Sequence, residues 1–279
     1  MSFPVELMEN ILENPDSYRL LRKIPEQIFF GAVMGGESSF IILDVETTGL
    51  KAGVNEIIEL GMVEVFFNSM GLVNTKLVGS FYEQPTVPIS EEITQITGIT
   101  NEMVEGHRID DERVKKILHK GRLVVAHNAG FDRKFIDKRF PELSELTWVC
   151  TLNDVDWESR GIKSKSLEAL LVNKGWFYDA HRASNDCIAT AQLIASYNLL
   201  EELVNAPTSR VKINALRAPF DKKDILKMRG YRWNAGAKYW HKTLSQKQVD
   251  DEMEFLSKEV YSDKNYAIVE QEDQHSRYA

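Results

Sequence analysis

The 279 residues are enough for one medium-sized domain plus a smaller one, and the 43% hydrophobic and 27% charged content is typical of soluble globular proteins. The net charge of −8 is unevenly spread, because residues 210–243 hold ten Lys/Arg against two Asp, a local charge of +8 that leaves −16 elsewhere. The sequence contains neither an apolar run long enough to cross a bilayer nor a secretory signal. Its two cysteines, Cys150 and Cys187, are too few for a disulfide framework or a zinc site. We therefore expect a cytoplasmic protein with reduced cysteines and no membrane partner.

The N-terminal segment is predicted to be helical. Over residues 4–30, apolar side chains such as Leu7 and Ile11 recur at helical spacing, with a break at residues 14–17. We expect an N-terminal helical extension over residues 1–36, which covers the sheet or contacts a partner.

The next part of the chain predicts a mixed α/β layer. A meander of three strands is followed by helices that alternate with two more short apolar strands. This pattern predicts a mixed five-stranded sheet flanked by helices. The expected strands lie at 40–43, 56–65, 76–82, 123–126 and 147–150, and the expected helices at 90–96, 101–105, 110–120, 131–139, 166–174 and 184–204.

A boundary is expected at residues 206–209, before a small basic α+β module at 210–260 and a flexible tail at 261–279. The module combines Lys and Arg with aromatic residues, a composition that suits binding of a nucleic-acid strand. We expect Phe220, Trp233 and Trp240 to form the module's core. Its charges are expected to contact nucleic acid, and the alternative is that they are merely solvated.

Asp44 and Glu46 are the first candidate site residues. They stand two apart at the end of an apolar strand and therefore point the same way. Two adjacent carboxylates repel each other unless a cation lies between them or one of them holds a proton, and oxygen ligands favour Mg²⁺ or Mn²⁺. The alternative is a pair of solvated carboxylates at a strand end.

Two further segments bring acids to the ends of elements. Asp132 follows a buried strand near the start of a helix, where a carboxylate is also favoured by the helix dipole alone. His181 precedes Asp186 at another loop-to-helix junction, and a histidine near a metal-bound water can accept its proton. His127 is expected to be a structural histidine.

Three segments together, 40–50, 127–136 and 181–186, resemble the three motifs of the DnaQ-like exonucleases of the DEDDh branch, of the type found in the DNA polymerase III epsilon subunit. The resemblance covers residues 38–203 and implies a ribonuclease H-like exonuclease domain at 37–205. It also implies a 3′-to-5′ exonuclease that releases nucleoside 5′-monophosphates in DNA repair, processing or proofreading.

The resemblance also implies roles for individual residues. Asp44, Glu46, Asp132 and Asp186 would hold two Mg²⁺ ions, for which Mn²⁺ is expected to substitute, and His181 would act as the general base. The expected partners are the 3′ end of single-stranded DNA and a DNA polymerase or another replication or repair protein. Contacts with the terminal nucleotide are implied for Thr47, Thr48, Gly49, Leu50, Asn128 and Phe131, with core packing as the alternative for Leu50 and Phe131.

Two other functions stay open at this point. An exoribonuclease would use the same site chemistry, and contact with the 2′-hydroxyl would distinguish it. A non-catalytic nucleic-acid-binding or polymerase-accessory protein is disfavoured by the complete set of four carboxylates and one histidine.

Overall fold

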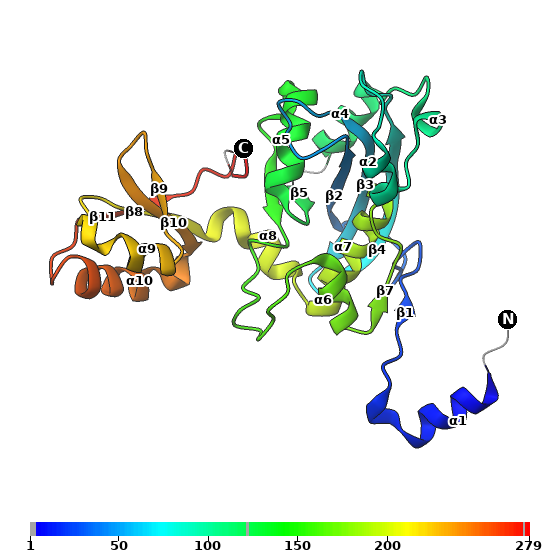
Figure 1. Cartoon of the computed structure of the whole chain (residues 1–279), viewed down its shortest axis with the longest axis horizontal. Helices are drawn as coiled ribbons and strands as arrows, with labels where there is room; N and C mark the ends of the chain where they lie inside the picture. The colour runs from blue at the N-terminus through cyan, green and yellow to red at the C-terminus, as the bar shows by residue number, and fades with distance from the viewer. Residues whose placement is uncertain (1–3, 121–122, 276) are drawn as a thin grey trace.

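The computed structural model describes residues 4–120, 123–275 and 277–279. A central domain lies between a C-terminal module and an N-terminal segment that projects away from it (Figure 1). Over these residues, no helix combines the length and the apolarity needed to cross a membrane.

The central domain contains the predicted mixed five-stranded sheet, in the order β4-β3-β2-β5-β6. The first three strands pair antiparallel, and β5 and β6 run parallel to β2. All five strands lie where the apolar runs predicted them. Their bounds are β2 (Ser38–Thr47), β3 (Ile57–Asn68), β4 (Gly71–Tyr82), β5 (Leu123–Ala126) and β6 (Thr147–Cys150).

Helices cover both faces of this sheet (Figure 1). On one face, Phe40 and Ile42 of β2 pack in a core cluster with α6, α7 and α8; on the other, Ile41 and Leu43 pack with α4 and α5. This alternation places successive β2 side chains in different layers. The helices are α2 (Glu91–Thr97), α3 (Asn101–Val104), α4 (Asp111–Lys120), α5 (Ala129–Arg139), α6 (Leu167–Asn173), α7 (Ala183–Tyr197) and α8 (Leu200–Ser209).

The helix predicted at 184–204 is interrupted, because α7 ends at Tyr197 and Asn198 caps it. Asn198 adopts a left-handed conformation with φ of 54°, which asparagine tolerates better than most residues. Residues 206–209, where a boundary was predicted, lie within helix α8 (Leu200–Ser209) immediately before strand β8 (Arg210–Ala215). Helix α8 continues through Pro207 to Ser209 and leads directly into the C-terminal module.

The N-terminal segment is only partly helical, so the prediction of a helical extension was wrong beyond α1 (Val5–Glu13); residues 1–3 lie outside the described residues. Pro15 begins a single 3₁₀ turn, and the short strand β1 (Arg22–Lys23) pairs with β7 (Trp176–Phe177). Ile24 and Ile28 are buried in the central core. Packing against the central domain therefore overrides the helical spacing after residue 17.

The C-terminal module contains a four-stranded antiparallel sheet in the order β11-β8-β10-β9, with helices packed on one face. Trp240 is buried as predicted, but Trp233 is 49% exposed and Phe220 is 81% exposed, so these two rings are not core residues. Aliphatic side chains such as Ile213 and Leu256 fill the core instead. The elements are β8 (Arg210–Ala215), α9 (Lys223–Met228), β9 (Arg232–Asn234), β10 (Tyr239–Ser245), α10 (Val249–Phe255) and β11 (Ala267–Gln271).

The tail predicted to be flexible is instead built into the fold. Strand β11 pairs with β8, and the residues after it return to the central domain (Figure 1). There the buried Arg277 contacts Asp154 at 2.5 Å, and the Tyr278 hydroxyl donates to the same carboxylate at 2.6 Å. The polar composition of the tail predicted solvation, whereas in the structure Arg277 is buried in an ion pair with Asp154.

Candidate active site

Strand β2 carries two carboxylates at its C-terminal end. Because side chains alternate along a strand, Asp44 and Glu46 continue the row of Phe40 and Ile42, which packs with α7. Both carboxylates therefore lie on the α7 side of the sheet.

Asp186, in the first turn of α7, completes a cluster of three carboxylates. One ligand oxygen from each of Asp44, Glu46 and Asp186 lies within 4.8 Å of the others. Asp186 is held in place because its Oδ1 accepts the Tyr178 hydroxyl at 2.8 Å and its Oδ2 accepts the backbone N–H of Arg182 at 3.1 Å. Three acidic oxygens at this spacing form a donor set that suits Mg²⁺ or Mn²⁺.

Asp132 lies beside this cluster but outside the group of three. It is buried in the first turn of α5, and its Oδ1 accepts the backbone N–H of Val45 at 3.2 Å. Its charge acts on the cluster, because burial and then the nearby charges of Asp132 and Asp186 raise the pKa of Asp44 well above its usual range. The fourth carboxylate predicted for the site is thus adjacent to the other three.

Burial and mutual repulsion dominate the electrostatics of the site. Burial, followed by the charge of Asp186, raises the pKa of Glu46 from 4.5 to about 8, and burial raises the pKa of Asp132 to about 8. Without a cation these carboxylates keep protons near neutral pH, and a divalent cation would take the place of those protons.

The metal-free protein is therefore expected to lose stability as the pH rises from about 4.5 to about 8. The folded state retains protons that the unfolded state releases in this range, so stability falls with increasing pH. Mg²⁺ should remove this penalty, and the increase in Tm on adding Mg²⁺ should reach about 5 °C at the alkaline end. Thermal melts in EDTA and in Mg²⁺ across this range measure the difference, and a Mg²⁺ effect that does not vary with pH would contradict the prediction.

His181 lies on the loop before α7 and is exposed. Its backbone is left-handed, with φ of 62°, in a region that few residues other than glycine adopt. Burial raises the pKa of Asp186, while the hydrogen bonds that Asp186 accepts and the nearby charge of His181 oppose that shift. The imidazole of His181 is therefore close enough to act on the cluster. His181 is thus an exposed titratable group beside the carboxylates.

Glu59 and Arg182, which are not among the predicted site residues, hold this loop against the sheet. Glu59 is fully buried opposite Glu46, and the Arg182 guanidinium donates to both of its oxygens at 3.1 Å. Gly61 allows the close approach, because a Cβ there would lie 2.4 Å from the carbonyl carbon of Ala183. The available signal was a lone acid within the otherwise apolar run 57–63.

The segments predicted to contact substrate are the turn after β2 and the start of α5. Leu50, after β2, is 85% exposed, so core packing does not account for this side chain. Phe131 is half-buried, and its ring centroid lies 4.9 Å from that of Phe135. The Thr47 hydroxyl donates to the Gly49 carbonyl at 2.7 Å, which orders the turn after β2.

Asn128 and Thr48 complete the predicted substrate set, and His127 precedes Asn128. Asn128 starts α5 with φ of 83°, and Thr48 Oγ1 accepts the backbone N–H of Glu56 at 3.1 Å. His127 has the structural role that we expected, with Nδ1 2.7 Å from the Thr151 hydroxyl and Nε2 3.0 Å from the Lys165 carbonyl.

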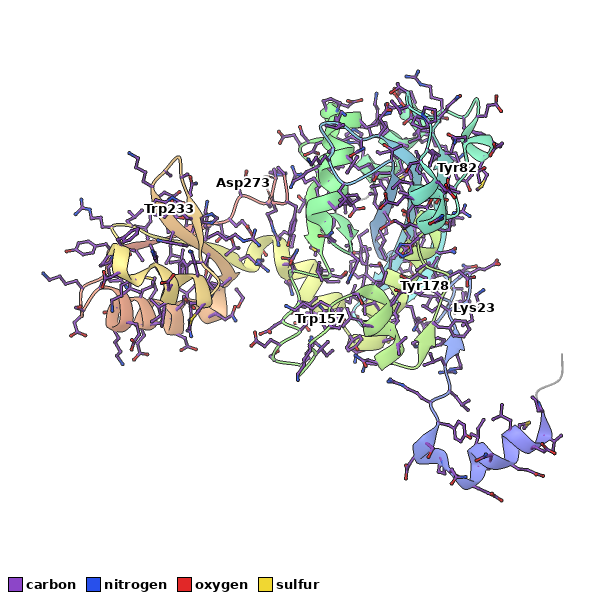
Figure 2. All side chains as sticks on the ribbon, in the orientation of Figure 1. Lys23, Tyr82, Trp157, Tyr178, Trp233 and Asp273 are labelled. Atoms are coloured by element: carbon purple, nitrogen blue, oxygen red, sulfur yellow. The ribbon has the colours of Figure 1, made fainter. Side chains whose placement is uncertain are left out.

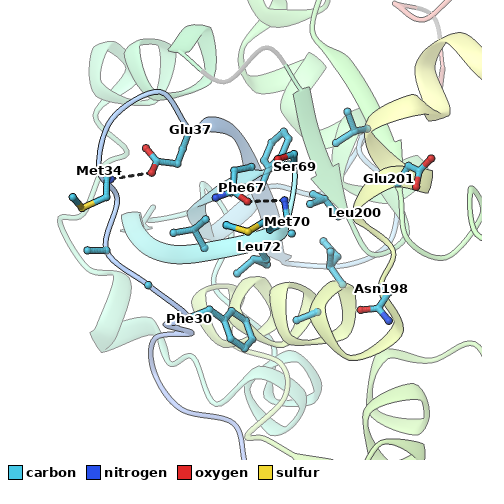
Figure 3. A pocket seen from close by; sticks show the side chains of 18 of the residues that line it. Phe30, Met34, Glu37, Phe67, Ser69, Met70, Leu72, Asn198, Leu200 and Glu201 are labelled. Atoms are coloured by element: carbon cyan, nitrogen blue, oxygen red, sulfur yellow. Dashed lines mark hydrogen bonds between the residues drawn. The ribbon is translucent and has the colours of Figure 1, made fainter.

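A pocket with a cavity volume of about 1080 Å³ lies at the opposite end of the central sheet (Figure 3). Its walls come from the β3–β4 hairpin, including Phe67 and Leu72, and from the region of Asn198 and Leu200. Glu37 on its wall immediately precedes β2, whereas the carboxylate cluster follows the end of that strand. The pocket is therefore separate from the candidate active site.

Comparisons with known proteins agree with this geometry. The RNase T exonuclease family model matches residues 41–194. The PolC-type DNA polymerase III of Caldanaerobacter subterraneus subsp. tengcongensis is 35% identical over 176 residues, which cover 60% of this chain and 12% of the relative. The DNA polymerase III subunit epsilon of Aquifex aeolicus is 30% identical over 174 residues, which cover 60% of this chain and 83% of the relative.

Among solved structures, exonuclease X in complex with 5′-overhanging duplex DNA is 28% identical. The match covers 60% of this chain and 98% of that chain, with a TM-score of 0.43. The chain spans only 12% of the length of its PolC-type relative.

Proposed function

Since this chain belongs to the RNase T exonuclease family, we propose that it is a metal-dependent 3′-to-5′ exonuclease that acts on DNA and releases nucleoside 5′-monophosphates. The observation that carries the proposal is the convergence of Asp44, Glu46 and Asp186 from a strand and a helix more than a hundred residues apart. A buried cluster of like charges that contributes nothing to folding is typical of a functional site.

We assign the carboxylates to two ions. Asp44, Glu46 and Asp186 would hold one, and Asp44 and Asp132 the other. Two Mg²⁺ ions, with Mn²⁺ expected to substitute, would stabilise the attacking and leaving oxygens of the phosphoryl displacement. An acidic site also needs this positive charge before it can accept a polyanion.

His181 is the group that we propose to accept the proton of the attacking water. Its exposed position beside Asp186 leaves it free to exchange that proton with solvent. Arg182 and Glu59 would position His181, because Arg182 follows it directly and its guanidinium donates two hydrogen bonds to the buried Glu59 carboxylate. Tyr178 would orient Asp186 in the same way.

The segment after β2 would contact the terminal nucleotide. Thr47, Thr48 and Gly49 would present their backbone to it, and the exposed Leu50 would pack against its base. Asn128 and Phe131 would contribute from the start of α5. We place this activity in cytoplasmic DNA replication or repair, alone or beside a DNA polymerase, because the relatives described above are DNA polymerase III components.

End-labelled DNA tests the proposal. In Mg²⁺, a 5′-labelled single strand should shorten progressively, whereas a 3′-labelled strand should release its label at once as a mononucleotide. EDTA should stop both reactions. A matched RNA strand should be degraded more slowly. Immediate release of the 5′ label would contradict the proposed 3′-to-5′ polarity. Activity in EDTA would contradict the metal dependence, and faster degradation of RNA would contradict the choice of DNA as substrate.

A further inference from the structure

The sheet of the C-terminal module has one face free of helices. Trp240 and Leu244 of β10 point into the module's core, so the alternate residues of the same strand, Tyr239 and His241, point to the other face. The antiparallel register places Arg232 of β9 directly opposite His241, and Lys212 of β8 opposite Thr243. Cations from neighbouring strands thus share this open face.

Strand β11 contributes one acid to this face, because Glu270 lies opposite Lys212 and accepts a hydrogen bond from Asn214. Within the described ranges, no carboxylate forms an ion pair with Lys212, Arg232 or Lys238. Their charges act on His241, whose pKa is lowered by burial and then by the proximity of Lys212 and Arg232. An anionic ligand would relieve this repulsion.

The helical side of the module carries acidic residues, some of which pair with its cations. Arg229 and Lys242 both contact the buried Glu252, at 3.4 and 2.9 Å, so these two cations are already paired. Helix α10 adds Asp250, Asp251 and Glu254. Lys212, Arg232 and Lys238 thus differ from Arg229 and Lys242, because no acid of the helical layer pairs with them.

Aromatic rings lie on the same β9–β10 hairpin as two of these cations, Arg232 and Lys238. The half-buried Tyr239 lies on the open face, whereas Trp233 of the edge strand β9 lies on the helical face, with its ring centroid 5.5 Å from that of Trp240, and is 49% exposed (Figure 2). The hairpin that carries them is ordered, because Asn234 accepts the backbone N–H groups of Ala237 at 2.9 Å and Lys238 at 2.8 Å. Cations that follow phosphates and rings that stack on bases are the two components of a surface for single strands.

We infer that Lys212, Arg232, Lys238 and Tyr239, here called the hairpin surface, bind single-stranded nucleic acid. The inference rests on the proposed function only for its choice of ligand, the strand whose end is hydrolysed. The contacts of Arg277 and Tyr278 with Asp154 tie the module to the central domain, so a strand bound here is held near the nuclease.

Fluorescence anisotropy of the full chain with labelled oligothymidylate in EDTA tests the inference without hydrolysis. Lys212→Glu/Arg232→Glu should weaken binding by about tenfold at moderate salt and reduce the slope of log affinity against log salt by about 1.4. Tyr239→Ala should weaken binding by about tenfold with little change in that slope. The matched control is Lys227→Glu/Lys258→Glu, which changes the net charge equally on the helical layer and should weaken binding much less.

Thermal melts establish that each variant is folded. Equal loss in the test and control variants would overturn the inference, because net charge alone would then explain binding. Unchanged affinity in the test variant would also overturn it and would favour an acidic protein as the ligand. If the variants change strand binding as expected but the protein does not degrade labelled DNA in Mg²⁺, the proposed function is wrong, whereas the inference that the hairpin surface binds single strands is supported.

Discussion

Replacing Asp44 with asparagine is expected to lower the rate of DNA hydrolysis by about 10³-fold or more, because Asp44 is shared between both proposed ions. The fold should survive. Asparagine has nearly the same shape, and the substitution removes one of several buried charges that repel each other. The metal-free variant should therefore melt no lower than the wild-type protein.

Initial rates on single-stranded DNA in Mg²⁺ and calorimetric titration with Mn²⁺ measure the two consequences. Asp224→Asn is a suitable control because Asp224 is exposed on α9 in the C-terminal module. A folded Asp44→Asn protein with wild-type hydrolysis, or with wild-type uptake of Mn²⁺, would remove the basis of the metal assignment.

His181→Ala is expected to lower kcat by about 10²- to 10⁴-fold, the usual range for loss of a general base, while the Kd for DNA changes little. The side chain is exposed and has no structural partner among the hydrogen bonds of the described residues, so its removal should not affect folding. Its proposed contribution arises only when a proton leaves the attacking water.

Single-turnover rates and anisotropy in EDTA separate catalysis from binding. Added imidazole should restore part of the rate, since the vacated position is open to solvent. His119→Ala serves as the control because His119 is an exposed histidine on α4. Parallel losses in kcat and affinity, or no rescue by imidazole, would exclude His181 as the base.

Local patterns in the sequence were sufficient for the central sheet and for part of the site. Apolar runs located β2 to β6, because burial of a strand requires apolar side chains whatever its neighbours are. The alternation in β2 placed Asp44 and Glu46 on one side, since strand geometry sets that direction locally. Resemblance to known motifs supplied Asp132, His181 and Asp186, which the residues alone would have left as helix-start carboxylates and a surface histidine.

Tertiary contacts decided the features that depend on distant partners. Glu59 pairs with Arg182 across 123 residues, and neither residue has a distinctive local pattern. The tail around Arg277 looked solvated because its partner, Asp154, is 123 residues away. Trp233 and Trp240 are direct partners on the same face of the module's sheet, yet Trp240 is buried and Trp233, on the edge strand β9, is 49% exposed. Periodicity specifies which side chains share a face, whereas the folded topology specifies what covers that face.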